Sequence, residues 1–507
     1  MRIAIVLKRY VVLPPYGFRS ETIASMASLQ AAAPLAGTVA RGGSAIRRGG
    51  LSERIQVLDA VSVDGPRLVE MTPETELALR LEEPSLKIVP VVEYHTMKLM
   101  HRVQREVSTS AAVSGDSTTD LIIQDAEGQP VAGAKIIAFT NFRSRTGDEA
   151  ESGKDGRVRL RIKADTTLER LYVYGPPRFW GYFRRSYILT EGAAVPLKGI
   201  DLSDPSLALR QFRNHVPREA GAGVVVGIID TGIARNHPLL PNVLGGANMV
   251  SDETRDEPGL VDDWGPARID GDHGTHVAGI VGARPQPATD LAGVAPEVGL
   301  RSYRVFPHAG GGATNYDIMS AIDRAVQDGC HIINLSLGGG GEDEAVRAAI
   351  GSAMDRGVIV VAAAGNDGRK PVSFPAALPF CVAVSAMGWK GSFPGDSTEA
   401  GDIAPPYGTR DKKSFVAAFS NFGPQIDLTG PGTGIVSTLP LGSFGVMSGT
   451  SMACPAVAGY AAFLLGSEPT ILNATGESRS KQLLDRLYGT AKELGFGRDY
   501  EGFGLPG

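Results

Sequence analysis

Cysteine is scarce in this sequence. Three cysteines occur among 507 residues. An odd and sparse set cannot build the disulfide network that holds small secreted domains together, so a disulfide-stabilised scaffold is excluded. Cys330 and Cys381 lie on or beside apolar runs, and Cys454 lies among small residues. We therefore expect all three to be buried as free thiols.

Long apolar stretches are also missing. No run of about 18 residues is apolar and free of charge, so we expect no transmembrane helix and no membrane partner. Near the start, Lys8 and Arg9 interrupt the apolar run, and no small-residue cleavage site follows it closely. This pattern does not fit a signal peptide. As the chain stands we expect a cytoplasmic protein, and the sequence leaves export open.

Charge of one sign is not in excess. Lys and Arg number 50 and Asp and Glu number 55, which gives a net charge of −5. Without a global basic field we expect no nucleic-acid partner. Two Arg-Gly-Gly triplets, at positions 41 and 48, have no interleaved aromatics, so a flexible loop is the favoured interpretation over RNA contact.

The length predicts several domains. Residues 1–100 suggest a small α+β domain, in which Thr72 caps a short helix and residues 87–94 form a closing strand. Residues 101–117 are predicted as a linker. Residues 118–200 contain short strands separated by turn residues, which predicts a β-sandwich module. The remaining residues, 203–507, form the largest unit.

This last unit has the pattern of an α/β fold. Continuous apolar runs at 224–230, 300–306, 331–337, 358–364 and 381–385 alternate with helical patterns at 316–327, 342–355 and 451–465. Such strands are buried on both faces, so we expect a doubly wound parallel sheet with helices on both sides. Residues 388–414 interrupt the pattern and are interpreted as a surface insertion.

Four polar residues of this unit could together catalyse acyl transfer. A serine hydroxyl needs a base within hydrogen-bond reach, and the base needs an orienting carboxylate. Asp230 ends an apolar strand, His273 begins the run His-Gly-Thr-His-Val-Ala-Gly, and Ser451 lies in Gly-Thr-Ser-Met-Ala-Cys-Pro. Asn366 follows another apolar strand and could donate to an oxyanion.

Each of these residues also has a simpler interpretation. Asp230 and Asn366 would suit ordinary turns, and Ser451 would suit a helix N-cap. His273 and His276 are three residues apart and could ligate a metal, but zinc would need further ligands and the His-Glu-x-x-His form is not present.

Read as one ordered pattern, the four segments closely resemble the subtilisin-like serine peptidases, or subtilases. The resemblance covers roughly residues 205–466. It implies a subtilisin-like doubly wound fold and hydrolysis of peptide bonds through an acyl-enzyme, with protein or peptide substrates. It assigns Asp230, His273 and Ser451 as the triad and Asn366 as the oxyanion donor. It also implies a substrate-binding set consisting of Ser336, Leu337, Gly338, Ala364 and Gly365.

The N-terminal unit, residues 10–95, resembles the inhibitory propeptide of the same family in its order of elements. This implies a zymogen that processes itself, with its own propeptide as inhibitor. We expect the cut between residues 94 and 118, in an exposed strip, leaving the β module attached to the catalytic domain. The β module itself resembles transthyretin-like or carboxypeptidase-regulatory-like modules, which names no activity.

No cofactor or metal is expected. The family's calcium loop is replaced here at residues 283–290, and the acidic run at 252–272 is interpreted as solvated, so calcium is possible but unsupported. We expect a monomer. Two other functions remain open: a catalytically silent scaffold whose β module binds a partner, and an esterase that uses the same triad.

Overall fold

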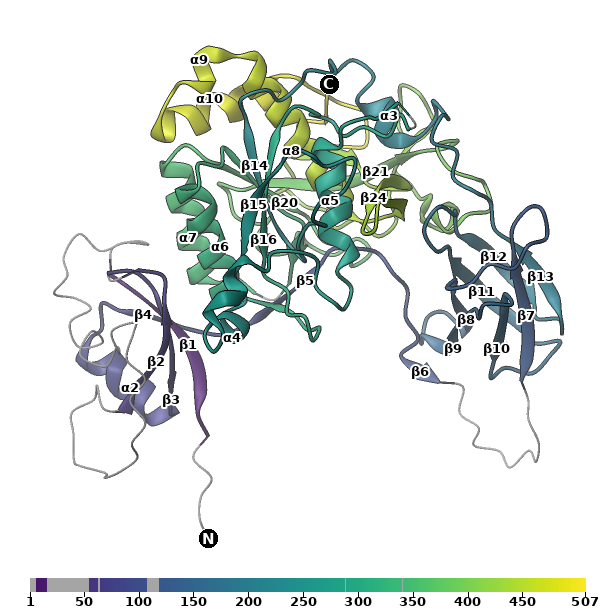
Figure 1. The fold of residues 1–507 in the computed structure, drawn as a ribbon, viewed down its shortest axis with the longest axis horizontal. Coiled ribbons are helices and arrows are strands. Elements are labelled where there is room, and N and C mark those ends of the chain that lie inside the picture. Colours follow the sequence, from purple (N-terminus) through teal and green to yellow (C-terminus); the bar gives the residue numbers. More distant parts are fainter. Residues whose placement is uncertain (1–5, 16–53, 63, 107–117, 288, 340) are drawn as a thin grey trace, which may run out of the picture.

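The computed structural model describes residues 6–15, 54–62, 64–106, 118–287, 289–339 and 341–507. Figure 1 shows a central α/β domain with an N-terminal unit on one side and an all-β module on the other. Both Arg-Gly-Gly triplets lie outside the described residues.

The central domain is built on an eight-stranded sheet. Its path runs β15-β16-β14-β18-β20-β21-β22, and β23 also pairs with β21. All pairs are parallel except β21 with β22, so the parallel sheet predicted from the apolar runs is confirmed, with one antiparallel edge added. The strands are β14 (Val225–Asp230), β15 (Val243–Asn248), β16 (Gly299–Arg304), β18 (Ile332–Leu335), β20 (Ile359–Ala363), β21 (Val382–Trp389), β22 (Ser414–Val416) and β23 (Leu428–Pro431).

Helices cover both faces of this sheet, because alternate residues of each strand enter different apolar cores. In β14, Val226 and Ile228 pack with α5 (Asp272–Gly282) and α8 (Thr450–Ser467), whereas Ile229 packs with α6 (Asn315–Gln327) and α7 (Glu344–Asp355). By length and composition α8 could cross a membrane, but 83% of it is buried inside the protein, as in a core helix.

Shorter elements complete the central domain. They are α3 (Ala208–Phe212), α4 (Ser251–Thr254), η3 (Pro258–Asp262), β17 (Ala313–Thr314), β19 (Leu337–Gly338), η4 (Thr398–Asp402), β24 (Ile435–Leu439), β25 (Ser443–Met447), α9 (Pro469–Leu472), α10 (Gly476–Gly489), β26 (Ala491–Lys492), α11 (Arg498–Glu501) and β27 (Leu505–Pro506).

The N-terminal unit is an antiparallel sheet with one described helix. The sheet has the order β2-β3-β1-β4, and Thr72 caps the helix α2 as predicted. Its elements are β1 (Lys8–Leu13), β2 (Gln56–Ala60), β3 (Arg67–Met71), α2 (Pro73–Glu82) and β4 (Lys87–Pro90). In β1, Tyr10 and Val12 pack with α2, whereas Val11 and Leu13 join the core formed by α6 and α7. One face of the sheet therefore docks on the central domain.

The prediction of a single strand at residues 87–94 was wrong. The chain forms β4 and then a separate strand, β5 (Glu93–Thr96), which inserts between β17 and β19 of the central domain. The Asn315 side chain holds the turn between them, because its Nδ2 donates to the carbonyl of Pro90 and its Oδ1 accepts from the amide of Val92. A partner so distant in sequence cannot be read from a local pattern.

The all-β module consists of two sheets that enclose an apolar core. One sheet has the order β10-β7-β13 and the other β12-β11-β8-β9-β6. The strands are β6 (Arg105–Glu106), β7 (Thr119–Gln124), β8 (Lys135–Asn141), β9 (Thr146–Glu151), β10 (Arg157–Leu160), β11 (Thr167–Tyr174), β12 (Tyr182–Ile188) and β13 (Ala193–Pro196).

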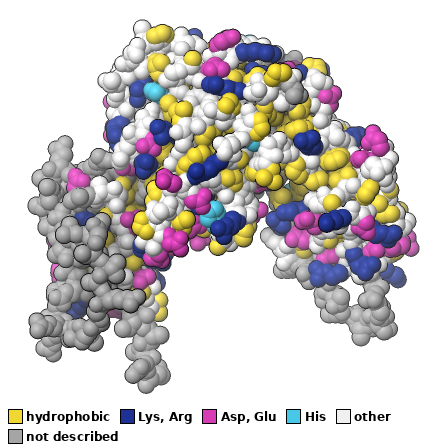
Figure 2. Space-filling view, viewed as in Figure 1, with side chains coloured by type: hydrophobic (Ala, Val, Ile, Leu, Met, Phe, Trp, Pro, Cys, Tyr) yellow, Lys and Arg dark blue, Asp and Glu magenta, His cyan; other side chains and the backbone are white. Residues whose placement is uncertain are grey.

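The insertion at 388–414 makes part of the contact between this module and the central domain, and the amide of Arg178 also donates to the carbonyl of Phe444 in β25 at 2.9 Å. The Asp396 carbonyl accepts from the amide of Phe183 at 2.7 Å, and its carboxylate pairs with Lys198 at 2.7 Å. The buried Trp180 also enters the core of the central domain. Figure 2 shows the notch that separates the module from the central domain beyond these contacts.

Candidate active site

The fold brings the four predicted catalytic segments to one edge of the central sheet. Asp230 is the last residue of β14, and Asn366 lies three residues after β20. His273 and Ser451 are each the second residue of a helix, α5 and α8. Because the carboxyl ends of parallel strands meet at the same edge, the strand ends and the helix starts converge there.

Asp230 and His273 form a buried pair. Asp230 Oδ1 lies 2.8 Å from His273 Nδ1, and neither side chain is more than 1% exposed. The carboxylate holds the ring in the tautomer that carries a proton on Nδ1. Within the described part of the chain, His273 Nε2 has no hydrogen-bond partner, which leaves it available as a base.

Ser451 is held by Ser336 in this structure. Its hydroxyl donates to the carbonyl of Ser336 at 2.9 Å, and the Ser336 hydroxyl donates to the carbonyl of Ser451 at 2.9 Å. A hydrogen bond from Ser451 to His273 is therefore not formed here. Such bonds often form only when the reacting complex assembles.

A segment of the chain itself occupies the adjoining cleft. β5 pairs antiparallel with β19, so that Thr96 lies opposite Leu337 and His95 opposite Gly338. The amide of Met97 then donates to the carbonyl of Ser336 at 3.1 Å. This is the addition of a strand to a sheet edge, the mode expected for an extended peptide substrate.

The carbonyl of Met97 is bound by two donors. It accepts from the amide N–H of Ser451 at 3.2 Å and from Nδ2 of Asn366. The Asn366 amide is oriented by Thr450, whose N–H and Oγ1 both lie 2.9 Å from Asn366 Oδ1. With its oxygen turned to Thr450, the side chain presents Nδ2 to the Met97 carbonyl. Sequence analysis did not identify this role of Thr450.

Two glycines make room for Met97. Gly449 has φ 151°, and a Cβ there would lie 2.3 Å from the carbonyl oxygen of Met97. A Cβ on Gly338 would lie 2.7 Å from the Met97 Cε and 3.0 Å from the carbonyl of Phe374. The Met97 side chain therefore lies against Gly338, which belongs to the predicted substrate-binding set.

The other two predicted pocket residues lie behind Asn366. Ala364 is fully buried, and its carbonyl accepts from the amide of Ser373 at 2.9 Å. The amide of Gly365 donates to Thr450 Oγ1 at 3.1 Å. These bonds fix the loop that carries Asn366.

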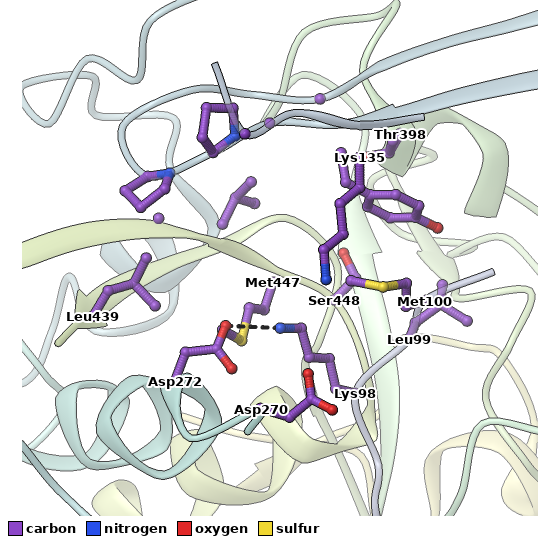
Figure 3. A pocket seen from close by; sticks show the side chains of 18 of the residues that line it. Lys98, Leu99, Met100, Lys135, Asp270, Asp272, Thr398, Leu439, Met447 and Ser448 are labelled. Carbon is purple, nitrogen blue, oxygen red and sulfur yellow. Dashed lines mark hydrogen bonds and ion pairs between the residues drawn. The ribbon is translucent and has the colours of Figure 1, made fainter. Parts of the chain in front are cut away.

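Residues 98–100 continue through the cleft. The prediction of an exposed strip after residue 94 was therefore wrong for these residues. The amide of Leu99 donates to the carbonyl of Ser448 at 2.8 Å, and Lys98 Nζ lies 2.9 Å from Asp272 Oδ2 (Figure 3). Both residues are half-buried. Sequence analysis placed Asp272 only at the end of the acidic run at 252–272, and its partner could not be predicted because Lys98 lies 174 residues away.

The alternative of a metal held by His273 and His276 does not fit these contacts. His273 Nδ1 is engaged by Asp230, and His276 Nε2 faces the carbonyls of Ile435 and Gly445 at 3.0 and 3.2 Å. Burial lowers the pKa of His276 to about 3, with His273 adding to the shift, so the ring is neutral. No group of three or more His, Cys, Asp or Glu side chains that could hold a metal occurs among the residues described.

The acidic run at 252–272 does not fit a calcium site. Asp263 accepts from His308 at 2.8 Å, and Glu253 is paired with the buried Arg304 at 2.8 Å. Both carboxylates are therefore already bonded to side chains of the chain itself, and Arg304 neutralises Glu253.

Comparisons with known proteins agree with this geometry. A model of the subtilase family matches residues 221–504. Subtilisin NAT from Bacillus subtilis subsp. natto is 35% identical over 319 residues, which span 62% of this chain and 71% of that protein. Subtilisin DY from Bacillus licheniformis is 37% identical over 279 residues, 54% of this chain and 86% of that protein. Since the family model covers more than half of the chain, this protein belongs to the subtilase family of serine endopeptidases.

Proposed function

We propose that the peptidase acts through Asp230, His273 and Ser451, with Asn366 and the amide of Ser451 as the oxyanion hole. The observation that carries this proposal is the carbonyl of Met97, which both donors bind at once. Two donors on one carbonyl oxygen stabilise the negative charge that develops on it when a nucleophile attacks its carbon.

The chemistry follows from these positions. Ser451 Oγ attacks the carbonyl carbon while His273 Nε2 takes the hydroxyl proton, and Asp230 stabilises the imidazolium. The tetrahedral intermediate collapses when His273 gives that proton to the leaving nitrogen, which releases an amine and leaves an acyl-enzyme. Water then attacks the ester through the same base, releases the acid and restores the Ser451 hydroxyl.

The bond held in the cleft is Met97–Lys98, and we propose that the enzyme cuts its own chain there. The N-terminal unit would act as an inhibitor that delivers β5 to the cleft. Its sheet packs on the central domain, and ion pairs between Lys87 and Glu344 and between Arg9 and Asp252 hold it in place. The cut would lie within the expected interval, residues 94–118, and would leave the β module attached.

The test is to purify the full chain and its Ser451→Ala form and to compare their N-termini. We expect the active form to start at Lys98 and the Ser451→Ala form to keep its original start. Labelling with a serine-directed fluorophosphonate and turnover of an extended peptide should occur only in the first. An active form starting near residue 200 would place the β module in the removed part. Equal starts in both forms would exclude self-processing, and labelling without peptide turnover would favour the esterase alternative.

A further inference from the structure

The residues that follow the Met97–Lys98 bond enter a cavity between the central domain and the β module. The cavity has a volume of about 580 Å³. Figure 3 shows Lys98, Leu99 and Met100 within it. Besides Lys98, the Asp, Glu, Lys and Arg side chains of its walls are Asp270, Asp272, Glu399, Asp402, Lys135 and Arg268. Burial raises the pKa of Glu399 and raises that of Asp402 well above its usual range, so these two acids do not count as fixed negative charges in the cavity.

Lys98 places its charge on one of these acids. Its Nζ lies 2.9 Å from Asp272 Oδ2, and the two side chains are 22% and 39% exposed. Lys98 is the only hydrogen-bonding partner of the Asp272 side chain among the described residues. Burial is the largest single effect on the pKa of Asp272 and would raise it, but the charge and hydrogen bond of Lys98, together with His273 and His276, outweigh burial, so the net shift is downward and the carboxylate is ionised at neutral pH.

The position of Asp272 ties this ion pair to the reaction. Asp272 is the first residue of α5 and directly precedes His273. The N-terminus of a helix favours a carboxylate. The cation that pairs with Asp272 is the side chain of Lys98. The backbone nitrogen of Lys98 is the leaving group in the proposed cut, so Asp272 contacts the residue immediately after the bond.

From this arrangement we propose that Asp272 selects a basic residue, Lys or Arg, immediately after the bond that the enzyme cuts. The inference rests on the proposed catalytic function and adds a substrate class to it: peptides with an apolar residue before the bond and a cation after it. Lys135 projects from the β module into the same cavity (Figure 3), and Arg268 also lines it. Their charges disfavour a second cation in the cavity, so the preference is proposed for the first position only.

The test uses the processed enzyme and peptides of the form Tyr-His-Thr-Met-X-Leu-Met, where X is Lys, Arg, Met or Glu. We expect kcat/KM to be about five- to tenfold higher for X = Lys or Arg than for X = Met, and lower still for X = Glu, as suits a partly exposed ion pair. Asp272→Asn should remove the preference for Lys over Met. Asp272→Lys should reverse it in favour of Glu.

Two features keep this test specific. Each preference is a ratio measured on one enzyme, so any effect of the Asp272 variants on His273 cancels. Asp270→Asn is the matched control, because Asp270 lies on the same wall without bonding to Lys98, and it should keep the preference (Figure 3).

Equal rates for Lys and Met in the unmodified enzyme would overturn the inference even if the variants failed to fold. Retention of the preference in Asp272→Asn would also overturn it. Failure to cut any of the peptides would instead contradict the proposed function.

Discussion

The amide of Asn366 is oriented by Thr450. Thr450 occupies the amide oxygen of Asn366 through its N–H and its hydroxyl, so the amide nitrogen faces the carbonyl of Met97. The sequence predicted the donor but not the residue that orients it. A Thr next to the proposed serine nucleophile is recognised only as part of the sequence motif. The motif does not predict the direction of the Thr hydroxyl.

Removing the donor should therefore slow the chemical step. We expect Asn366→Ala to lower kcat by about 10²–10³ with little change in KM, a range established on a subtilisin. Steady-state kinetics on an extended peptide measure both constants. A rise in KM alone would mean that Asn366 shapes the pocket without stabilising the oxyanion.

Single residues also mark the limit of sequence reasoning about the site. Asp230, His273 and Ser451 could be assigned because the ordered segments around them resemble those of the subtilases, whereas each local signal alone also fitted a turn, a metal ligand or a helix cap. Asp272 could not be assigned, since its contact depends on how Lys98 is delivered by the N-terminal unit. The apparent alternative for His276 was settled by its full burial against backbone carbonyls.

At the scale of elements, the turn before α8 lies close to the backbone of Met97. Gly449 has a positive φ, and a Cβ there would lie 2.3 Å from the carbonyl oxygen of Met97. Gly449→Ala should therefore displace the carbonyl from its donors and strain the turn. We expect kcat/KM to fall by about 10²–10³, comparable to the loss of an oxyanion donor.

A second glycine offers a control for the added methyl group. Gly341→Ala adds a methyl group at a position where a Cβ would meet nothing within 4 Å. It should retain near-normal kcat/KM and the same melting temperature. A Gly449→Ala enzyme that is folded and fully active would show that the carbonyl does not bind where the structure places it.

Strands could be predicted where nearly all of their residues are apolar and buried. The strands β14, β18 and β20 are continuous apolar runs, and such runs have few alternatives to a buried parallel sheet. β15 escaped prediction because Gly245 and Gly246 interrupt it, and its pairing with β16 shifts register at that point. From sequence alone, glycine within a strand indicates a turn, and only the paired strand shows that the chain stays extended.

At the scale of the whole molecule, the sequence separated the units but did not position them. The N-terminal sheet docks through residues that alternate with those of its own core. From sequence alone this pattern predicts a strand that is buried on both faces, but not which unit covers the second face. The β module is held by Asp396, within a segment that looked like a surface insertion. Such contacts depend on surfaces that exist only after each unit folds.

The stability of the central domain should depend on pH through Asp317. This residue is 2% exposed at the start of α6, where its Oδ1 accepts from the amide of Ser251 at 3.0 Å. Burial raises its pKa from 3.8 to about 7, although hydrogen bonds from Ser251 and Thr314 oppose the shift. Between these two values the folded state keeps a proton that the unfolded state has lost. The free energy of unfolding therefore falls as the pH rises from about 4 to 7 and levels off above that.

Asp317→Asn removes this titration while keeping an oxygen that can accept from Ser251. Relative to the parent, we expect the free energy of unfolding of the variant to rise by about 2 kcal/mol between pH 5 and pH 8. Urea unfolding followed by Trp fluorescence at both pH values measures the difference, in a Ser451→Ala background so that every chain stays uncut. Asp355→Asn, at an exposed position on α7, controls for the loss of one negative charge. An Asp317→Asn effect of the same size at both pH values would show that Asp317 is ionised in the folded protein throughout this range, and that its buried carboxylate is stabilised more strongly than the bonds to Ser251 and Thr314 account for.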